Sequence, residues 1–304
     1  MTSDARAALT RGVEGLRAAS LAPVVRASDP AGDILRRGVA ISAYNLLETF
    51  IEGRLEELTV HINLTHLHFA DLSDRLQQLA TQNLLNVASA RARRMTKQDV
   101  RTFVEGLGRS LAAVHGGINL SSLTWLWSGS NMGADDFVTI LKAFHVKDTM
   151  RAVDDLAHRF GFPKTLDPKG ELHEFGQQRH RAAHNSAHQI TNLWIPSAID
   201  QLVKFSITFD AFASVGAGAL RRGDADFLAD DNWTTGNLGI RRITERANGV
   251  WAEHTETGGT RAVKIDRDLH TLTLAAAGRC TDRDILVISD QSGQIIDWSI
   301  PQVG

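Results

Sequence analysis

Cysteine is nearly absent from this chain, since Cys280 is the only one among 304 residues. A single thiol excludes a disulfide within the chain and favours a reducing compartment. Long apolar runs are missing too, because no stretch approaches the ~18 uninterrupted apolar residues that cross a membrane. The first residues mix charges of both signs and contain no apolar signal core. We therefore expect a cytoplasmic protein with no membrane partner.

An excess of charge of one sign is also missing. The 33 Lys and Arg residues are balanced by 35 Asp and Glu residues, which gives a net charge of −2 at pH 7. The chain as a whole thus lacks the positive net charge of many nucleic-acid-binding proteins, and any RNA contact must come from a local patch of basic residues. The composition, 43% hydrophobic and 22% charged, is typical of a globular protein.

The longest periodic segment begins at Asp29-Pro30, where the aspartate can cap a helix and the proline fits its first turn. Apolar residues then recur at spacings of three, four and seven, which predicts a helix of roughly eight turns with one buried stripe. The stripe consists of Ile34, Ile41, Tyr44, Leu47, Ile51, Leu55, Leu58 and Ile62. Further helices are predicted over residues 4–20, 71–94, 96–115, 134–143, 147–160, 172–190 and 195–215.

The composition changes after about residue 220. Short strands are predicted there over residues 260–265, 271–274, 284–289 and 294–300, with hairpin turns at Gly258-Gly259 and at 290–293. We therefore predict a mainly α protein in three parts. These are an N-terminal helical extension over residues 1–29, an α-helical domain over 30–220 and a small β-rich subdomain over 221–304.

The most specific chemical pattern is Arg-His-Arg-Ala-Ala-His at residues 179–184, within the helix predicted over 172–190. A guanidinium neutralises charge that builds on phosphate oxygens, and an imidazole titrates near neutral pH. This combination suits cleavage of RNA by its own 2′-hydroxyl group. In such a site His184 is the base, Arg179 stabilises the phosphorane, and His180 orients a group or transfers a second proton.

Positions five apart on a regular helix lie about 140° apart around its axis, so Arg179 and His184 do not point the same way. One copy therefore supplies half a site, whereas two copies across a two-fold axis would line one cleft with Arg and His from both chains. A stripe of acidic residues on the long helix, Glu48, Glu52 and Glu56, is predicted to be solvated. One of these carboxylates would orient Arg179 if the two helices adjoin.

The order Arg, polar residue, three more residues and His, on the penultimate helix of an all-α domain, resembles the HEPN superfamily (higher eukaryotes and prokaryotes nucleotide-binding). Residues 179–185 are similar to the variant of RiboL-PSP-type and related bacterial members. Residues 40–56 resemble the family's first core helix, with its acidic face, and residues 199–209 resemble its last. The resemblance covers about residues 30–215 and implies a HEPN-like antiparallel helical bundle.

The resemblance also implies a metal-independent endoribonuclease without a cofactor, dimeric through its motif helices, that leaves 2′,3′-cyclic phosphate and 5′-hydroxyl ends. Arg179 and His184 match the family's catalytic pair, and His180 matches its polar position. Bacterial members are commonly toxins of toxin–antitoxin pairs or effectors of antiphage defence, so an antitoxin or a defence-system partner is expected. Secondary candidates for RNA contacts are Arg181, Asn185, Arg91, Arg93 and Arg94.

Two other interpretations stay open. His180, His184 and His188 are spaced four apart on one face of the predicted helix, so two of them with a distant carboxylate are a possible zinc site of a hydrolase. All three spread over about 12 Å, too far to reach one ion. In the other interpretation the helices form a non-catalytic interaction or RNA-binding module, and the motif lies on a solvated face.

Two tryptophans and a histidine are predicted to have structural rather than chemical roles. Trp125 and Trp127 precede a Gly-rich loop and are predicted to pack in the core, with base stacking as the alternative. His61, in an apolar neighbourhood, is predicted to be a core or boundary histidine.

Overall fold

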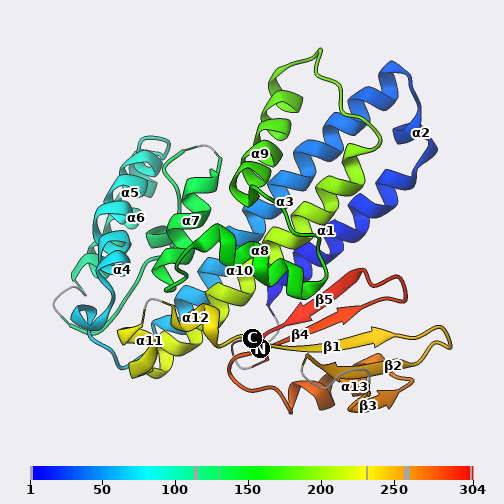
Figure 1. Cartoon of the computed structure of the whole chain (residues 1–304). Helices are drawn as coiled ribbons and strands as arrows, with labels where there is room; N and C mark the ends of the chain where they lie inside the picture. Colours follow the sequence, from blue (N-terminus) through cyan, green and yellow to red (C-terminus); the bar gives the residue numbers. More distant parts are fainter. Residues whose placement is uncertain are drawn as a thin grey trace.

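The computed structural model describes residues 3–112, 116–129, 131–230, 232–256, 261–301 and 303. This part of the chain is mainly helical and carries a small mixed sheet of five strands at its C-terminal end (Figure 1). The helices are α1 (Asp4–Leu21), α2 (Pro23–Arg26), α3 (Pro30–Ile62), α4 (Asp74–Gln78), α5 (Leu84–Ala92), α6 (Lys97–Ala112), α7 (Ala134–Ala143), α8 (Thr149–Phe160), α9 (Pro168–His184), α10 (Trp194–Arg222), α11 (Ala225–Ala229), α12 (Trp233–Gly236) and α13 (Leu269–Ala277). The strands are β1 (Gly239–Glu245), β2 (Trp251–Thr255), β3 (Lys264–Asp266), β4 (Asp284–Ser289) and β5 (Ile295–Ser299). The predicted mainly α fold with a C-terminal sheet is confirmed.

The long helix α3 lies at the centre and packs against α1, α9 and α10. Asp29 caps it as expected, because its side chain accepts a hydrogen bond from the backbone N–H of Gly32 at 2.7 Å. From Tyr44 to Ile62 the predicted stripe is buried. Its first member is an exception, since Ile34 is 60% exposed and the buried stripe does not reach the helix start.

Helix α10 is long and apolar enough to cross a membrane by length and composition alone. Its apolar window is nevertheless completely buried inside the fold, where α10 packs along α3. Helix α10 is thus a core helix, and it runs to Arg222 rather than ending near residue 215 as predicted.

The helix predicted over residues 71–94 consists of α4, a π-helical turn at Leu79–Asn83 and α5. Helix α6 buries none of its residues and packs loosely on α5 through Phe103, Leu107 and Leu111. The predicted end of this helix, residues 113–115, lies outside the described residues. Together α4, α5 and α6 form a group beside the central helices (Figure 1).

The strand order of the sheet is β3-β2-β1-β4-β5, and all neighbours are antiparallel except β1 and β4. Strand β4 reads as a continuous apolar run because both of its faces are covered. Ile285 and Val287 belong to the core shared with the helical part, whereas Leu286 and Ile288 pack in a cluster with Leu272 of α13. The sheet thus lies between α13 and the helical core.

Two of the predicted strands need correction, and two further strands were not predicted. Residues 271–274 are helical in α13, because Asp268 caps this segment and only Leu272 of the two leucines faces the sheet. The strand predicted over 260–265 is confined to β3, and the turn predicted at Gly258-Gly259 lies outside the described residues. Strands β1 and β2 were missed.

His61, near the end of α3, gives a test of pH dependence. Its Nδ1 lies 3.1 Å from Nη1 of Arg221, and burial together with the Arg221 charge lowers the pKa of His61 to about 4. The unfolded chain has a histidine pKa near 6.5, so between about pH 6.5 and pH 4 the unfolded state binds the extra proton. This contribution to stability is therefore complete above pH 6.5 and is lost as the pH falls towards 4.

We expect His61→Asn to reduce the drop in melting temperature between pH 7 and pH 4.5 relative to the unchanged protein. His270→Asn, at the exposed start of α13, is the control and keeps the full drop. An unchanged drop in His61→Asn, measured by thermal unfolding at both pH values, contradicts the assignment.

Candidate functional site

Helix α9 is fixed on α3 by a close contact next to the motif. Asp167 caps the helix and Pro168 occupies its first turn. The rings of Phe175 and Tyr44 meet edge to face with centroids 5.1 Å apart. At Gly176 a Cβ atom would lie 3.1 Å from the Tyr44 ring, so glycine permits this approach. One turn further along, Arg179 reaches α3.

The Arg179 side chain is half-buried, and its Nε donates a hydrogen bond to Oδ1 of Asn45 at 3.1 Å. It lines a polar cavity of about 370 Å³, which we call the Arg179 cleft. Arg91 and Arg94, at the end of α5, line the same cleft. The structure thus brings Arg179 to the same cleft as Arg91 and Arg94, which are distant from it in the sequence. The other residues lining the cleft are Asn45, Glu48, Thr49, Glu52, Val87, Ala90, Trp127, Ser128, Gly129 and Asn131.

The predicted acidic stripe contributes to the cleft in part. Burial raises the pKa of Glu48, although a hydrogen bond from the Met132 N–H at 2.5 Å and the charge of Arg179 oppose this shift. Glu48 therefore acts on Arg179 through its charge, whereas the hydrogen bond that orients the guanidinium comes from Asn45. Asn45 was missed, although it lies one turn before Glu48 on the same helix.

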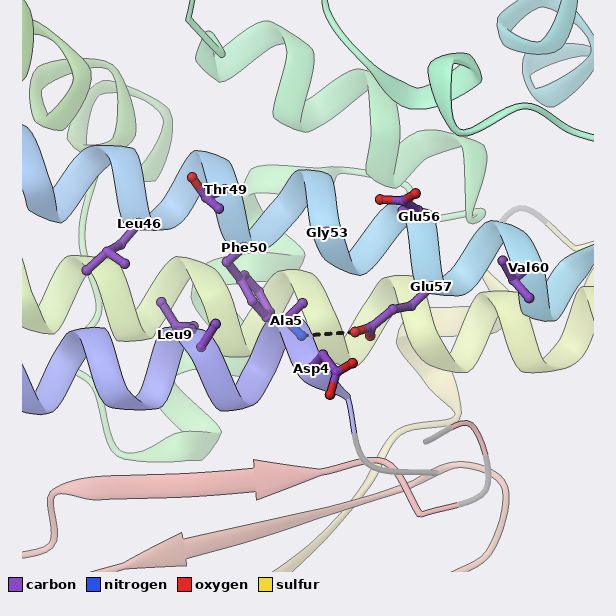
Figure 2. A pocket seen from close by; sticks show the side chains of 11 residues that line it. Asp4, Ala5, Leu9, Leu46, Thr49, Phe50, Gly53, Glu56, Glu57 and Val60 are labelled. Carbon is purple, nitrogen blue, oxygen red and sulfur yellow. Dashed lines mark hydrogen bonds between the residues drawn. The ribbon is translucent and has the colours of Figure 1, made fainter. Parts of the chain in front are cut away.

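The third member of the stripe, Glu56, lies elsewhere. It lines a second cavity, of about 450 Å³, between α1 and α3 (Figure 2). The side chains of Leu9, Leu46 and Phe50 border this groove, and Glu57 accepts a hydrogen bond from the Ala5 N–H across it. Its walls are mostly apolar, so it is less suited to phosphate chemistry than the Arg179 cleft.

His180 and His184 are exposed on the last two turns of α9, with ring centroids 4.7 Å apart. Neither lines the Arg179 cleft. This separation agrees with the angle of about 140° between positions 179 and 184 on a helix. A single chain therefore holds the arginine in the cleft and presents the imidazoles outside it.

The motif helix ends at His184, not near Ile190 as predicted, and Asn185 follows it in an extended conformation. His188 consequently leaves the helical face of His180 and His184, and its Nε2 lies 2.8 Å from Oε1 of Gln178. Among the described residues, no group of three or more His, Cys, Asp or Glu side chains is arranged to hold a metal ion.

The secondary candidates divide into two sets. Arg91 and Arg94 line the cleft, as described above. Arg93 is exposed but does not line it, and Arg181 pairs with Glu174 instead. The side chain of Asn185 accepts a hydrogen bond from the backbone N–H of Ala187 at 3.0 Å and stabilises the turn after α9.

In comparisons with known proteins, no family model, no curated protein and no solved structure matches this chain. The candidate site therefore rests on its residues and their geometry.

Proposed function

We propose that this chain is a HEPN-like, metal-independent endoribonuclease that cuts RNA at a composite site in a homodimer. The observation that supports it is the distribution of the motif along α9. Arg179 lines a cleft with Arg91 and Arg94, whereas His180 and His184 are exposed on the last two turns. A second copy whose motif helix faces the first would bring an imidazole to each cleft.

The chemistry needs only groups that the two chains carry. His184 takes the proton of the RNA 2′-hydroxyl, and the 2′-oxygen attacks the adjacent phosphorus. Arg179, oriented by Asn45, stabilises the negative charge on the phosphorane. The bond to the 5′-oxygen then breaks, and this oxygen takes a proton from a protonated histidine, for which His180 is the candidate. The products are a 2′,3′-cyclic phosphate and a 5′-hydroxyl end.

In this proposal the protein is a cytoplasmic toxin or an antiphage-defence effector, restrained by an antitoxin or by another defence component. The single cysteine and the buried position of α10 support an intracellular, soluble protein. A non-catalytic HEPN module is the alternative that the experiment below must separate from it.

We expect the purified dimer to cut a pool of tRNA and mRNA in the presence of EDTA. End-group analysis of the fragments should find cyclic phosphates that resist ligation until they are opened, and 5′ ends that a kinase labels without prior phosphatase treatment. Intact RNA after incubation with the protein, alone and with candidate partners, would favour the non-catalytic module. Cleavage that EDTA abolishes and zinc restores would favour a zinc-dependent hydrolase.

A further inference from the structure

The arginines of the Arg179 cleft are not neutralised by ion pairs. Among the described residues, no carboxylate pairs within 4.0 Å with Arg91, Arg94 or Arg179. Arg181, only two residues after Arg179, does pair with a glutamate. Three guanidiniums that form no ion pair among the described residues, around one cavity, are well suited to an anion with several oxygens, such as a phosphate group.

The cleft also carries features that a simple phosphate does not need. Trp127 lines it from the segment after the 3₁₀ turn Ser122–Trp125, and its ring is part-buried against the neighbouring apolar clusters. A ring held in this way offers a surface on which a nucleobase can stack. The carboxylates of Glu48 and Glu52, on the α3 side of the cleft, can accept hydrogen bonds from base N–H groups.

The two sides of the cleft therefore differ in charge. Arg91 of α5 and Arg94 of the turn after it lie on one side, whereas α3 supplies Glu48 and Glu52. A nucleotide has the matching asymmetry, with an anionic phosphate at one end and N–H donors on the base. The volume of about 370 Å³ is at the lower end of the range for small-ligand sites, which fits one nucleotide rather than a duplex.

We propose that the Arg179 cleft binds one unpaired nucleotide of single-stranded RNA, with its phosphate at Arg91, Arg94 and Arg179 and its base on Trp127. The proposal rests on the proposed function for the identity of the polymer, since a free nucleoside monophosphate carries the same chemical groups. In this proposal the end of α5 binds the phosphate and Trp127 selects an unpaired base, next to the bond that is cut.

Binding to a probe that cannot be cleaved tests the site without requiring catalysis. The probe is a tetranucleotide of 2′-O-methylcytidine, which lacks the attacking hydroxyl, and titration calorimetry measures its affinity. We expect Arg91→Ala/Arg94→Ala to weaken binding by about 10- to 100-fold, since two charge-assisted contacts to phosphate are lost. Arg93→Ala, next to them but outside the cleft, should change the affinity less than twofold.

Trp127→Leu tests the base contact, and we expect about tenfold weaker binding, because stacking contributes about 1–3 kcal/mol per base. Ribose 5-phosphate, which has no base, should bind weakly and equally to this variant and to the unchanged protein. Trp127 is part-buried, so Trp127→Leu can fail to fold. Arg91 and Arg94 are exposed, so Arg91→Ala/Arg94→Ala should keep the melting temperature of the unchanged protein. The double arginine variant therefore tests the site independently of Trp127→Leu.

Several results would overturn the proposal. Equal losses in Arg93→Ala and Arg91→Ala/Arg94→Ala would indicate non-specific attraction of a polyanion. Tight binding of cytidine monophosphate without binding of the tetranucleotide would assign the cleft to a free nucleotide. Equal affinity for an RNA duplex would exclude selection of an unpaired base. Specific binding by a protein that cuts no RNA would instead contradict only the nuclease function and leave this site in place.

Discussion

For the proposed nuclease, replacement of Arg179 or His184 by alanine should abolish most RNA cleavage and leave the fold and the proposed dimer intact. Loss of a group that stabilises the charge of a transition state lowers kcat by about 10²- to 10³-fold, and loss of a general base lowers it by about 10²- to 10⁴-fold. Both side chains are at least partly exposed, so neither truncation leaves a large cavity in the core. Single-turnover cleavage of a labelled RNA in EDTA measures both effects.

Matched controls separate chemistry from a general loss of charge. His173 is exposed on α9 two turns before His180 and should be replaceable without loss of activity. Arg151, with a side chain that is 84% exposed on α8, is the corresponding arginine control. Arg179→Lys should remain strongly impaired, because an ammonium keeps the charge but loses the planar fork that binds two phosphate oxygens. Wild-type cleavage by a folded Arg179→Ala or His184→Ala dimer would contradict the assignment.

Mixed dimers test whether the site is shared between two chains. A dimer of one Arg179→Ala chain and one His184→Ala chain, isolated with two different affinity tags, should recover about half of the wild-type rate. This follows because one of its two sites then receives Arg179 from one chain and His184 from the other. If both residues act within the same chain, the mixed dimer has no intact site, and its activity stays at the level of the parent variants.

Much of the helical architecture follows from local sequence rules. The cap at Asp29 and the regular apolar spacing after it locate α3, because a helix buries one face whatever its tertiary context. The C-terminal strands were harder to predict. In β1, Ile240 and Ile243 contribute to opposite faces of the sheet and enclose Arg241 and Arg242, so the segment has no apolar alternation. This segment forms a strand because it pairs with β4, and the local sequence does not reveal that pairing.

In the candidate site, too, some features could be predicted from the local sequence and others depend on tertiary contacts. The motif predicted Arg179 and His184, and helix geometry predicted that they would diverge. The partners of Arg179 depend on tertiary contacts: Gly176 lets α9 approach Tyr44, and this contact brings Arg179 within reach of Asn45. The end of α9 at His184 also removed His188 from the motif face, a change that no periodic pattern predicted.

The largest stability effect is expected at Asp210, which is completely buried on α10. Its Oδ1 accepts hydrogen bonds from Arg54 Nε and Ser214 Oγ, both at 2.6 Å. Its Oδ2 lies 2.9 Å from Arg6 Nε and accepts a hydrogen bond from Trp298 Nε1 at 2.8 Å. Elements α1, α3, α10 and β5 thus meet at one carboxylate, which links the C-terminal sheet to the helical core.

Asp210→Asn should therefore lower the free energy of unfolding by about 3–5 kcal/mol, because two buried guanidiniums lose the buried carboxylate that they share, although Arg54 keeps an ion pair with Glu57. Burial raises the pKa of Asp210, but Arg54, Arg6 and the hydrogen bonds outweigh it and hold the pKa below its usual value. The stabilisation is thus present above the unfolded pKa near 4 and is lost as the pH falls through the folded value. Asp155→Asn, which removes an exposed pair with Lys164, should cost less than about 1 kcal/mol. Urea unfolding at pH 7 measures both, and equal effects in the two variants would show that the buried network contributes no more than a surface ion pair.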